Sequence, residues 1–354
     1  MSDRSWRWFA VVAGLAAALL IAGACDEPAK AEDDVTPPRA GRFGSLRDLV
    51  LFERPGLGAS QALFFDRFEA TRGDWAAFAA TAAGRAVAAD AVLAVGDPSL
   101  PISSIDLLQA RAFARWRFLR LPRSDEWWFA AVGGRGGNRF PWGRREDTAR
   151  ANTLELGLGQ PTPVGTFESG RRTGGDQPYD WIGNVSEWTE TVPAWWSEWW
   201  PAEGAATGVL DPVSGLAACR RVVQATPALA VWEGPGGLMP LAWLHAAGGV
   251  YVPREVLGSD YQSPLAATTS ALPAGDRVAR TGVRLCATVR ELLVALVGDP
   301  ETPTAADVQQ LVRFVRRGRH RDVLREAWSD PLPPAGAHGP LFDVLRRELG
   351  FGGG

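Results

Sequence analysis

Hydrophobic and polar residues alternate with two different periods along the first third of the chain. Two short apolar runs, separated by the breaker pair Pro55 and Gly56, predict strands at residues 49–52 and 63–68. Apolar residues then recur at helical spacing and predict three helices. The helices are expected to begin near Thr71, Ser104 and Ser124, with apolar faces formed by Trp75, Phe78 and Ala79, by Ile105, Leu108, Ala112 and Trp116, and by Trp127, Trp128 and Phe129.

Two of these helices carry start signals in their first turn. Thr71 followed by Asp74 is a capping-box pattern, in which each side chain bonds the other residue's backbone amide. Asp125 and Glu126 follow Ser124 at the third helix, where the helix dipole favours acidic side chains. Beyond residue 133 the pattern changes to short strands and long loops rich in Gly, Pro and Trp. Loops of this length in a compact domain are functional or are ordered by something other than backbone ladders.

The last part of the chain, residues 291–354, is helical again and is predicted to form a small C-terminal appendix. Thr304 with Asp307 is another capping box, and a following apolar stripe predicts an amphipathic helix. The stripe consists of Val308, Leu311, Val312 and Val315. Shorter helices are expected at residues 322–328 and 342–349.

The N-terminus is typical of an export signal. Arg4 and Arg7 precede an apolar run that ends in small residues immediately before Cys25. We expect residues 1–25 to be a signal peptide with a lipobox, Cys25 to be acylated, and the mature protein to be anchored in the membrane of the bacterial cell envelope. Cleavage without acylation, or a retained anchor, is the alternative. Residues 26–45 are polar and proline-containing, which predicts a tether.

Composition and charge add few constraints. The chain has 354 residues, enough for one large domain with attachments. Its formal net charge of -3 predicts no nucleic-acid partner. Apart from Cys25, only Cys219 and Cys286 are present, and in an oxidising compartment they could form a disulfide or remain two separate buried thiols.

Four ordered segments resemble the formylglycine-generating enzyme family, also called the sulfatase-modifying factor domain. Each segment is weak alone, but their order is specific. They are residues 65–71, residues 119–127 with 140–143, residues 151–153 with 163–167 and 179–188, and residues 248–251 with 281–284. The resemblance implies an α+β, irregular, loop-rich domain of the C-type-lectin-like fold over residues 46–290.

The departures from the family pattern indicate lost chemistry. The family's oxidase activity uses two cysteines after a Gly-Gly-Ser motif to bind copper, and a soft thiolate pair suits Cu(I). The matching positions here are Pro253 and Gly258, and Val250 replaces the Ser. We therefore expect no catalytic residues of this type and no copper.

Other enzyme classes find no support in the sequence. Some relatives of this domain act beside a three-His iron site, but His245, His320 and His338 are scattered without metal-ligand spacing. No Gly-x-Ser-x-Gly elbow is present to indicate a serine hydrolase.

The ten residues 180–189 contain two carboxylates, two Trp and a Gly-Asn turn. By resemblance to the family's calcium loop, Asp180, Gly183, Val185 and Glu187 are predicted to hold a structural calcium ion, which prefers oxygen ligands. The alternative is a turn in which Asp180 caps backbone amides and Glu187 is exposed. A second calcium loop near Asn152 lacks a clear carboxylate partner.

Two further features indicate either contact with a partner or ordinary packing. The tryptophans following the loop are expected to contact a glycan or an envelope protein, or else to wedge under the loops. These residues are Trp188, Trp195, Trp196, Trp199 and Trp200. The basic run from Arg313 to Arg325 predicts contact with anionic lipid or glycan, or a solvated helix face.

Together these features predict an exported, lipid-anchored, non-catalytic binding or scaffold protein of the cell envelope. The first alternative is a diverged oxidase or hydroxylase acting on a protein or a small thiol. The second is a structural lipoprotein of an envelope assembly. Fold alone does not distinguish the three.

Overall fold

The computed structural model describes most of the chain between residues 42 and 351. The described residues are 42–87, 89, 91–134, 138–174, 176–194, 231–234, 237–240, 254–272, 275–328 and 338–351. All of them belong to one compact unit, Pro37–Gly354. The predicted signal peptide, the acylation site Cys25 and residues 26–41 of the tether therefore lie outside the described residues.

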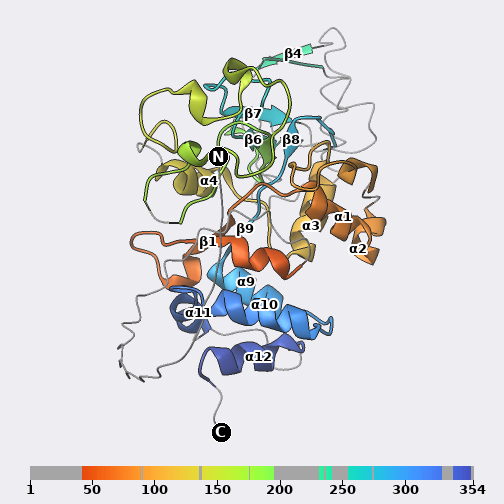
Figure 1. Ribbon diagram of the computed structural model, residues 1–354, viewed down its shortest axis with the longest axis vertical. Helices are drawn as coiled ribbons and strands as arrows, with labels where there is room; N and C mark the ends of the chain where they lie inside the picture. The colour runs from red at the N-terminus through yellow and green to blue at the C-terminus, as the bar shows by residue number, and fades with distance from the viewer. Residues whose placement is uncertain are drawn as a thin grey trace, which may run out of the picture. The chain divides into compact units, whose positions relative to one another are not determined.

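Strands from both ends of the domain meet in the first sheet (Figure 1). It is antiparallel in the order β1 (Leu49–Phe52), β2 (Leu63–Asp66) and β9 (Cys286–Thr288). Successive side chains of a strand point to opposite faces. Phe64 accordingly packs into one hydrophobic core, while Leu63 and Phe65 pack into a second. The central strand is thus buried on both faces, and the predicted strand at 63–68 ends at Asp66.

In the second sheet, the strand that contains Trp188 is a central strand, with a neighbour on each side. Its order is β7 (Thr269–Leu272), β6 (Arg254–Leu257), β3 (Ser186–Trp188) and β8 (Thr281–Gly282). Strands β3 and β8 run parallel, and the other neighbours are antiparallel. A separate hairpin joins β4 (Val231–Gly234) to β5 (Gly237–Pro240).

The predicted N-terminal helices are present as α1 (Arg72–Ala79), α3 (Leu107–Trp116) and α4 (Ser124–Val132), with a short α2 (Ala82–Ala86) between them. The capping box of Thr71 and Asp74 is confirmed. The second helix begins later than predicted, because Asp106 and Gln109 form a capping box there. Of the predicted apolar face, Ile105 and Ala112 are buried but Leu108 is 63% exposed, and Phe113 is fully buried instead.

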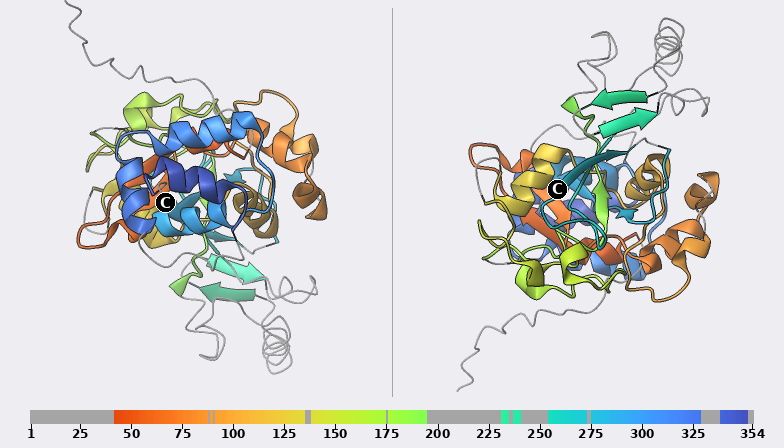
Figure 2. Two further views of the ribbon diagram at one scale, coloured as in Figure 1. Left: turned by 90° about the horizontal axis from the view of Figure 1, so that it is seen from below. Right: turned by 90° about the horizontal axis from the view of Figure 1, so that it is seen from above.

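The C-terminal helices share the main core. They are α9 (Val289–Val297), α10 (Ala305–Val315), α11 (His320–Trp328) and α12 (Leu341–Glu348), and they lie together in Figures 1 and 2. Helix α10 contacts the turn η1 (Gly44–Asp48), and α11 contacts η2 (Ala59–Gln61). Leu292 and Phe314 belong to the same buried cluster as Phe64. The structure therefore has no domain boundary at residue 290, and the predicted appendix is part of the domain.

The described helices are all short. None of them is both long enough and apolar enough to cross a bilayer.

Candidate functional site

The segment 180–189 enters β3 through a turn that only particular residues can form. Asp180, Gly183 and Asn184 have positive φ angles of 51°, 85° and 61°. A Cβ atom at Gly183 would lie 2.5 Å from the carbonyl oxygen of Asn152, so the close approach of the two backbones requires glycine. The turn thereby directs the Asn184 and Glu187 side chains into the interior, where both are 0% exposed.

Asn184 is fixed by a buried carboxylate from the N-terminal part of the domain. Its Nδ2 donates to Glu69 Oε2 at 2.6 Å, and its Oδ1 accepts from the Thr162 amide at 2.9 Å. The Val185 amide donates to Glu69 Oε1 at 3.0 Å. Glu69 is 1% exposed and therefore acts as an internal acceptor that shapes the turn.

Arg284 supplies the positive charge at the centre of this site. Its Nε donates to Glu187 Oε1 at 2.8 Å, and the guanidinium also donates to the carbonyls of Asp66, Tyr179 and Asp180. Trp127 Nε1 donates to Glu187 Oε2 at 2.6 Å. Both carboxylate oxygens of Glu187 thus have buried N–H donors. The arginine also lies over the Trp181 ring, 4.7 Å from its centroid.

The buried acids of this site titrate above their ordinary range. Burial raises the pKa of Glu69, Asp180 and Glu187, and that of Asp180 reaches about 6. The neighbouring Asp180 carboxylate raises the pKa of Glu69 further, while Arg284 acts in the opposite direction. Arg284 lowers the pKa of all three acids, so its charge partly offsets the effect of burial.

The predicted calcium ligands are engaged in contacts within the protein. Each carboxylate oxygen of Glu187 accepts from a buried N–H donor, and Asp180 Oδ2 accepts from the Gly165 amide at 2.7 Å. In the part of the chain that the structure describes, no three His, Cys, Asp or Glu side chains are grouped to hold a metal. Arg284 already places a positive charge 2.8 Å from Glu187, so this carboxylate has a charge partner without a metal ion.

Removing divalent metal is therefore expected to leave the stability of the protein unchanged. A calcium ion at about 100 times its dissociation constant would stabilise the fold by about 2.7 kcal/mol. For a folded unit of this size, its removal would lower the Tm by roughly 3–5 °C. Differential scanning calorimetry with EDTA, and again with added calcium, measures this. A clear fall in Tm with EDTA that calcium reverses would restore the calcium prediction.

The positions of the family's catalytic cysteines carry no thiol. Val250 and Pro253 lie outside the described residues. Gly258 has a φ of 100°, and a Cβ atom there would lie 2.8 Å from the Trp181 carbonyl oxygen. Its own carbonyl accepts from the Gly183 amide at 2.6 Å. The backbone at Gly258 is thus pressed against the 180–189 segment and leaves no room for a cysteine side chain.

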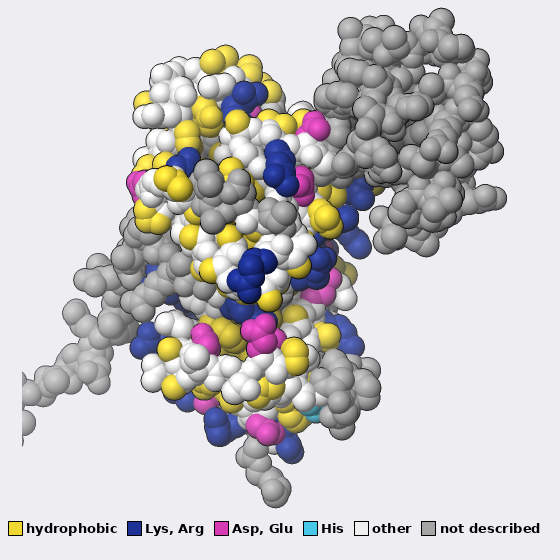
Figure 3. Space-filling view, turned by 90° about the vertical axis from the view of Figure 1, so that its right-hand side faces the viewer, with side chains coloured by type: hydrophobic (Ala, Val, Ile, Leu, Met, Phe, Trp, Pro, Cys, Tyr) yellow, Lys and Arg dark blue, Asp and Glu magenta, His cyan; other side chains and the backbone are white. Residues whose placement is uncertain are grey.

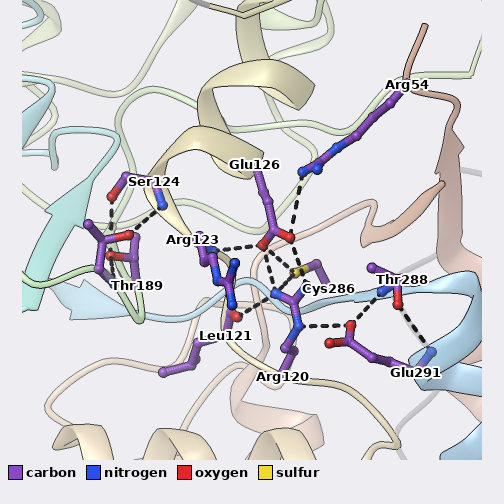
Figure 4. Close-up of polar contacts among 11 residues, drawn as sticks. Arg54, Arg120, Leu121, Arg123, Ser124, Glu126, Thr189, Cys286, Thr288 and Glu291 are labelled. Carbon is purple, nitrogen blue, oxygen red and sulfur yellow. Dashed lines mark hydrogen bonds and ion pairs between the residues drawn. The ribbon is translucent and has the colours of Figure 1, made fainter. Parts of the chain in front are cut away.

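Cys286 lies in a separate polar cluster at the N-terminal end of α4 (Figure 4). Arg120 forms two hydrogen bonds to Glu126, at 2.7 and 2.8 Å, one to Glu291 at 2.9 Å and one to the Cys286 sulfur at 3.2 Å. Arg54 lies 3.5 Å from the same Glu126 carboxylate.

The Cys286 thiol is not activated by this cluster. It is free and 0% exposed, and burial raises its pKa well above the ordinary value. A reactive cysteine needs a lowered pKa and access, so Cys286 has a packing role. Its predicted disulfide partner Cys219 lies outside the described residues, and the disulfide gains no support.

Trp188 is a core residue rather than a contact for a ligand. Its ring is 0% exposed, and its Nε1 donates to the Ile105 carbonyl at 2.9 Å. The prediction of surface contact is wrong for this ring, because β3 carries it into the space beside α3. The predicted contacts at Trp195, Trp196, Trp199 and Trp200 lie outside the described residues.

The basic run on α10 and α11 is largely paired within the domain. Arg316 lies 2.8 Å from Glu348, and Arg319 lies 2.5 Å from Glu53. Arg317 forms an ion pair with Asp176. These contacts favour the predicted solvated helix face over a lipid-binding surface.

The described histidines form no catalytic set. His320 is buried between Phe64 and Phe314, and His338 stacks on Phe342. His245 lies outside the described residues. No described histidine is therefore placed beside a nucleophile.

Sequence reasoning missed the two residues that organise the site, Glu69 and Arg284. Both occur in segments that carry the family resemblance, residues 65–71 and 281–284. The available signal was the position of these charged residues inside the family motifs, although residues 65–71 also contain Asp66 and Arg67. Their partners, however, lie about a hundred residues away in sequence, at Val185 and Glu187.

Comparison with known proteins agrees with the motifs. Residues 58–237, just over half of the chain, match the family described as Sulfatase-modifying factor enzyme 1-like domain. The chain is 36% identical over 99 residues to the Inactive C-alpha-formylglycine-generating enzyme 2 of Bos taurus, covering 25% of this chain and 32% of that protein. It is 30% identical over 131 residues to the Formylglycine-generating enzyme of Streptomyces coelicolor, covering 34% of this chain and 41% of that protein.

These alignments are partial. The chain spans about a third of the length of the curated relatives it matches. Among solved structures, the crystal structure of CarF aligns with 68% of this chain and 96% of its own at 16% identity, with a TM-score of 0.38.

Proposed function

Because the chain belongs to the sulfatase-modifying factor enzyme 1-like family, we propose that it is a non-catalytic member that acts as a binding or scaffold protein of the cell envelope. The predicted α+β, loop-rich domain of the formylglycine-generating type is confirmed, and members of the family include both enzymes and inactive proteins.

The observation that carries the proposal is the backbone at Gly258. The oxidase chemistry implied by the resemblance needs two thiolates that hold copper. Here one position is Pro253, and the other is a glycine whose missing Cβ would clash with a buried carbonyl. Among the surrounding polar groups, Arg284 is bonded to Glu187 and to backbone carbonyls, and Glu69 accepts from the Val185 amide and the Asn184 side chain. They support a rigid loop platform and offer no acid, base or nucleophile to a substrate.

The charge distribution agrees with a role other than nucleic-acid binding. The formal net charge is -3. On the face shown in Figure 3, arginine and acidic side chains of the described residues lie near one another, so that face carries no broad basic surface of the kind that binds a phosphate backbone.

An assay of the purified protein tests the proposal. A cysteine-containing peptide and Cu(I) are supplied, and oxygen uptake and oxidation of the peptide cysteine are followed. We expect no uptake above the rate without protein. Turnover that depends on protein concentration would establish the alternative, a diverged oxidase or hydroxylase.

Localisation is the second part of the proposal and rests on the sequence alone. The small residues before Cys25 favour an acylated N-terminus. In cells fed labelled palmitate, the wild-type protein is expected to take up label and to sediment with membranes, and Cys25→Ala is expected to do neither. Equal sedimentation of the two proteins without label would contradict the lipid anchor.

A further inference from the structure

One hollow in the described surface has the features of a binding site that the family resemblance does not assign. It has a volume of about 760 Å³ and is formed within a single stretch of chain. Its lining residues are Trp142, Arg144, Arg145, Glu146, Asp147, Thr148 and Arg150. Known small-molecule sites span roughly 300–1,000 Å³, so the hollow is large enough for one or two sugar rings. Most of its lining is polar, which favours a hydrophilic ligand.

The aromatic side of the hollow is held in place by buried contacts. The Trp142 ring stacks on Phe140 with an interplanar angle of 4° and a centroid distance of 5.2 Å. Phe140 is 0% exposed, and Trp142 Nε1 donates to the Arg145 carbonyl at 3.0 Å. The indole is therefore fixed by its stacking partner and its hydrogen bond, and it is half-buried at the edge of the hollow.

The charged side of the hollow has an excess of arginine, because its acidic side chains are already paired. Arg150 donates to Asp147 at 2.7 Å and to the Ser169 carbonyl at 3.0 Å, and Glu146 lies 3.8 Å from Arg139. Both acids thus face arginines. Arg144 and Arg145 are exposed, and neither has an ion pair within the part of the chain that the structure describes. Both residues line the hollow, and guanidinium groups match carboxylate or sulfate groups.

We propose that this hollow binds an acidic saccharide, with a sugar ring against Trp142 and its carboxylate or sulfate group on Arg144 and Arg145. Aromatic rings pack on the apolar face of a sugar, and guanidinium groups bind its anion. The choice of a glycan rests on the proposed function, since an exported binding protein meets acidic polysaccharides rather than nucleotides. The site thereby names acidic saccharides as the class of ligand for the proposed binding protein.

Calorimetric titration of the full chain tests the site. The probes are a trigalacturonate, a sulfated oligosaccharide of the same length, a neutral maltotriose, AMP and anionic phosphatidylglycerol vesicles. We expect one or both acidic saccharides to bind and maltotriose to give no measurable heat. Arg144→Gln/Arg145→Gln should weaken binding about tenfold or more, since each charge-assisted bond is lost. Trp142→Ala should weaken it about tenfold without a change in charge, and Trp142→Phe should retain part of the affinity.

The matched control is Arg346→Gln/Arg347→Gln, which removes an adjacent exposed pair on α12 and the same charge. We expect its affinity to stay within about twofold of wild type. An equal loss in the control pair would show general electrostatic attraction and overturn the site. Tighter binding of AMP or of the vesicles would overturn the ligand class. If no acidic saccharide binds while the protein also shows no oxygen uptake, the site fails and the non-catalytic function stands.

Discussion

Replacing Arg284 by Met is expected to lower the free energy of unfolding by about 3–5 kcal/mol, because it leaves the buried Glu187 carboxylate without its charge partner. The arginine is 0% exposed and bonds Glu187 and three backbone carbonyls. A typical domain has only about 5–15 kcal/mol of stability in total, so the loss is large. Urea unfolding followed by tryptophan fluorescence measures it.

Two further variants separate the cause from general damage. Arg346→Met removes an exposed arginine of α12 and is expected to change stability by less than about 0.5 kcal/mol. Arg284→Met/Glu187→Gln removes the unpaired charge and keeps an acceptor for the Trp127 indole, so it should recover part of the loss. A loss below about 1 kcal/mol in the single variant would contradict the role of Arg284 as the internal cation.

The second large effect concerns His320 and acid stability. Its ring lies 4.9 Å from the Phe64 ring and 4.8 Å from the Phe314 ring, and Nδ1 lies 3.0 Å from the Phe314 carbonyl. Burial, with a smaller effect of the Arg317 charge, lowers the pKa of His320 from 6.5 to about 4. The folded protein therefore holds this imidazole neutral at pH values where the unfolded chain protonates it.

The direction of the change in stability with pH follows from proton linkage. Between pH 6.5 and about 4 the unfolded state binds the extra proton, so the His320 contribution to stability is present above pH 6.5 and is lost as the pH falls through this window. The full loss is about 3 kcal/mol. Asp66 and Asp180 act in the opposite direction, because burial raises the pKa of each to about 6 and their contribution is lost as the pH rises towards that value.

The variant His320→Leu isolates the histidine from these acids. Unfolding is measured in urea at about pH 7.5 and about pH 4.5 for wild type, His320→Leu and the half-buried control His338→Leu. The wild type should lose roughly 2–3 kcal/mol more between the two pH values than His320→Leu does. Parallel pH profiles for these two proteins would show that His320 titrates normally in the folded state.

Local features of the fold could be predicted from the sequence. The capping boxes of Thr71 with Asp74 and of Thr304 with Asp307 are present, because each is formed by residues three positions apart. Helix α4 begins at Ser124 as expected. The start of α3 was misplaced because the apolar spacing of Ile105 and Leu108 outweighed the polar cap at Asp106.

The organisation of the site could not be read from spacing. Glu187 and Arg284 are 97 residues apart, and neither motif indicates that the two side chains form an ion pair. From the sequence alone, the Glu187 carboxylate is equally suited to bind calcium or to pair with an arginine. Trp188 was grouped with the tryptophans after it, although the strand partners of β3 decide that its ring faces the core.

The membership of the C-terminal helices in the core was likewise hidden. Phe314 and Phe64 are far apart in sequence, yet their rings meet at a centroid distance of 5.2 Å. A change of composition near residue 290 suggested a boundary that the packing does not have. Composition reports what a segment can bury but not which surface buries it.

The most direct test of the non-catalytic account is the stoichiometry of Cu(I) binding by protein carrying Cys25→Ser, which leaves Cys219 and Cys286 as its only thiols. Competition with a chromophoric Cu(I) chelator measures it. If the protein is non-catalytic, we expect no tightly bound Cu(I), because Gly258 and Pro253 occupy the positions of the family's two thiolate ligands. One equivalent of tightly bound copper, lost on mutation of Cys219 or Cys286, would contradict it.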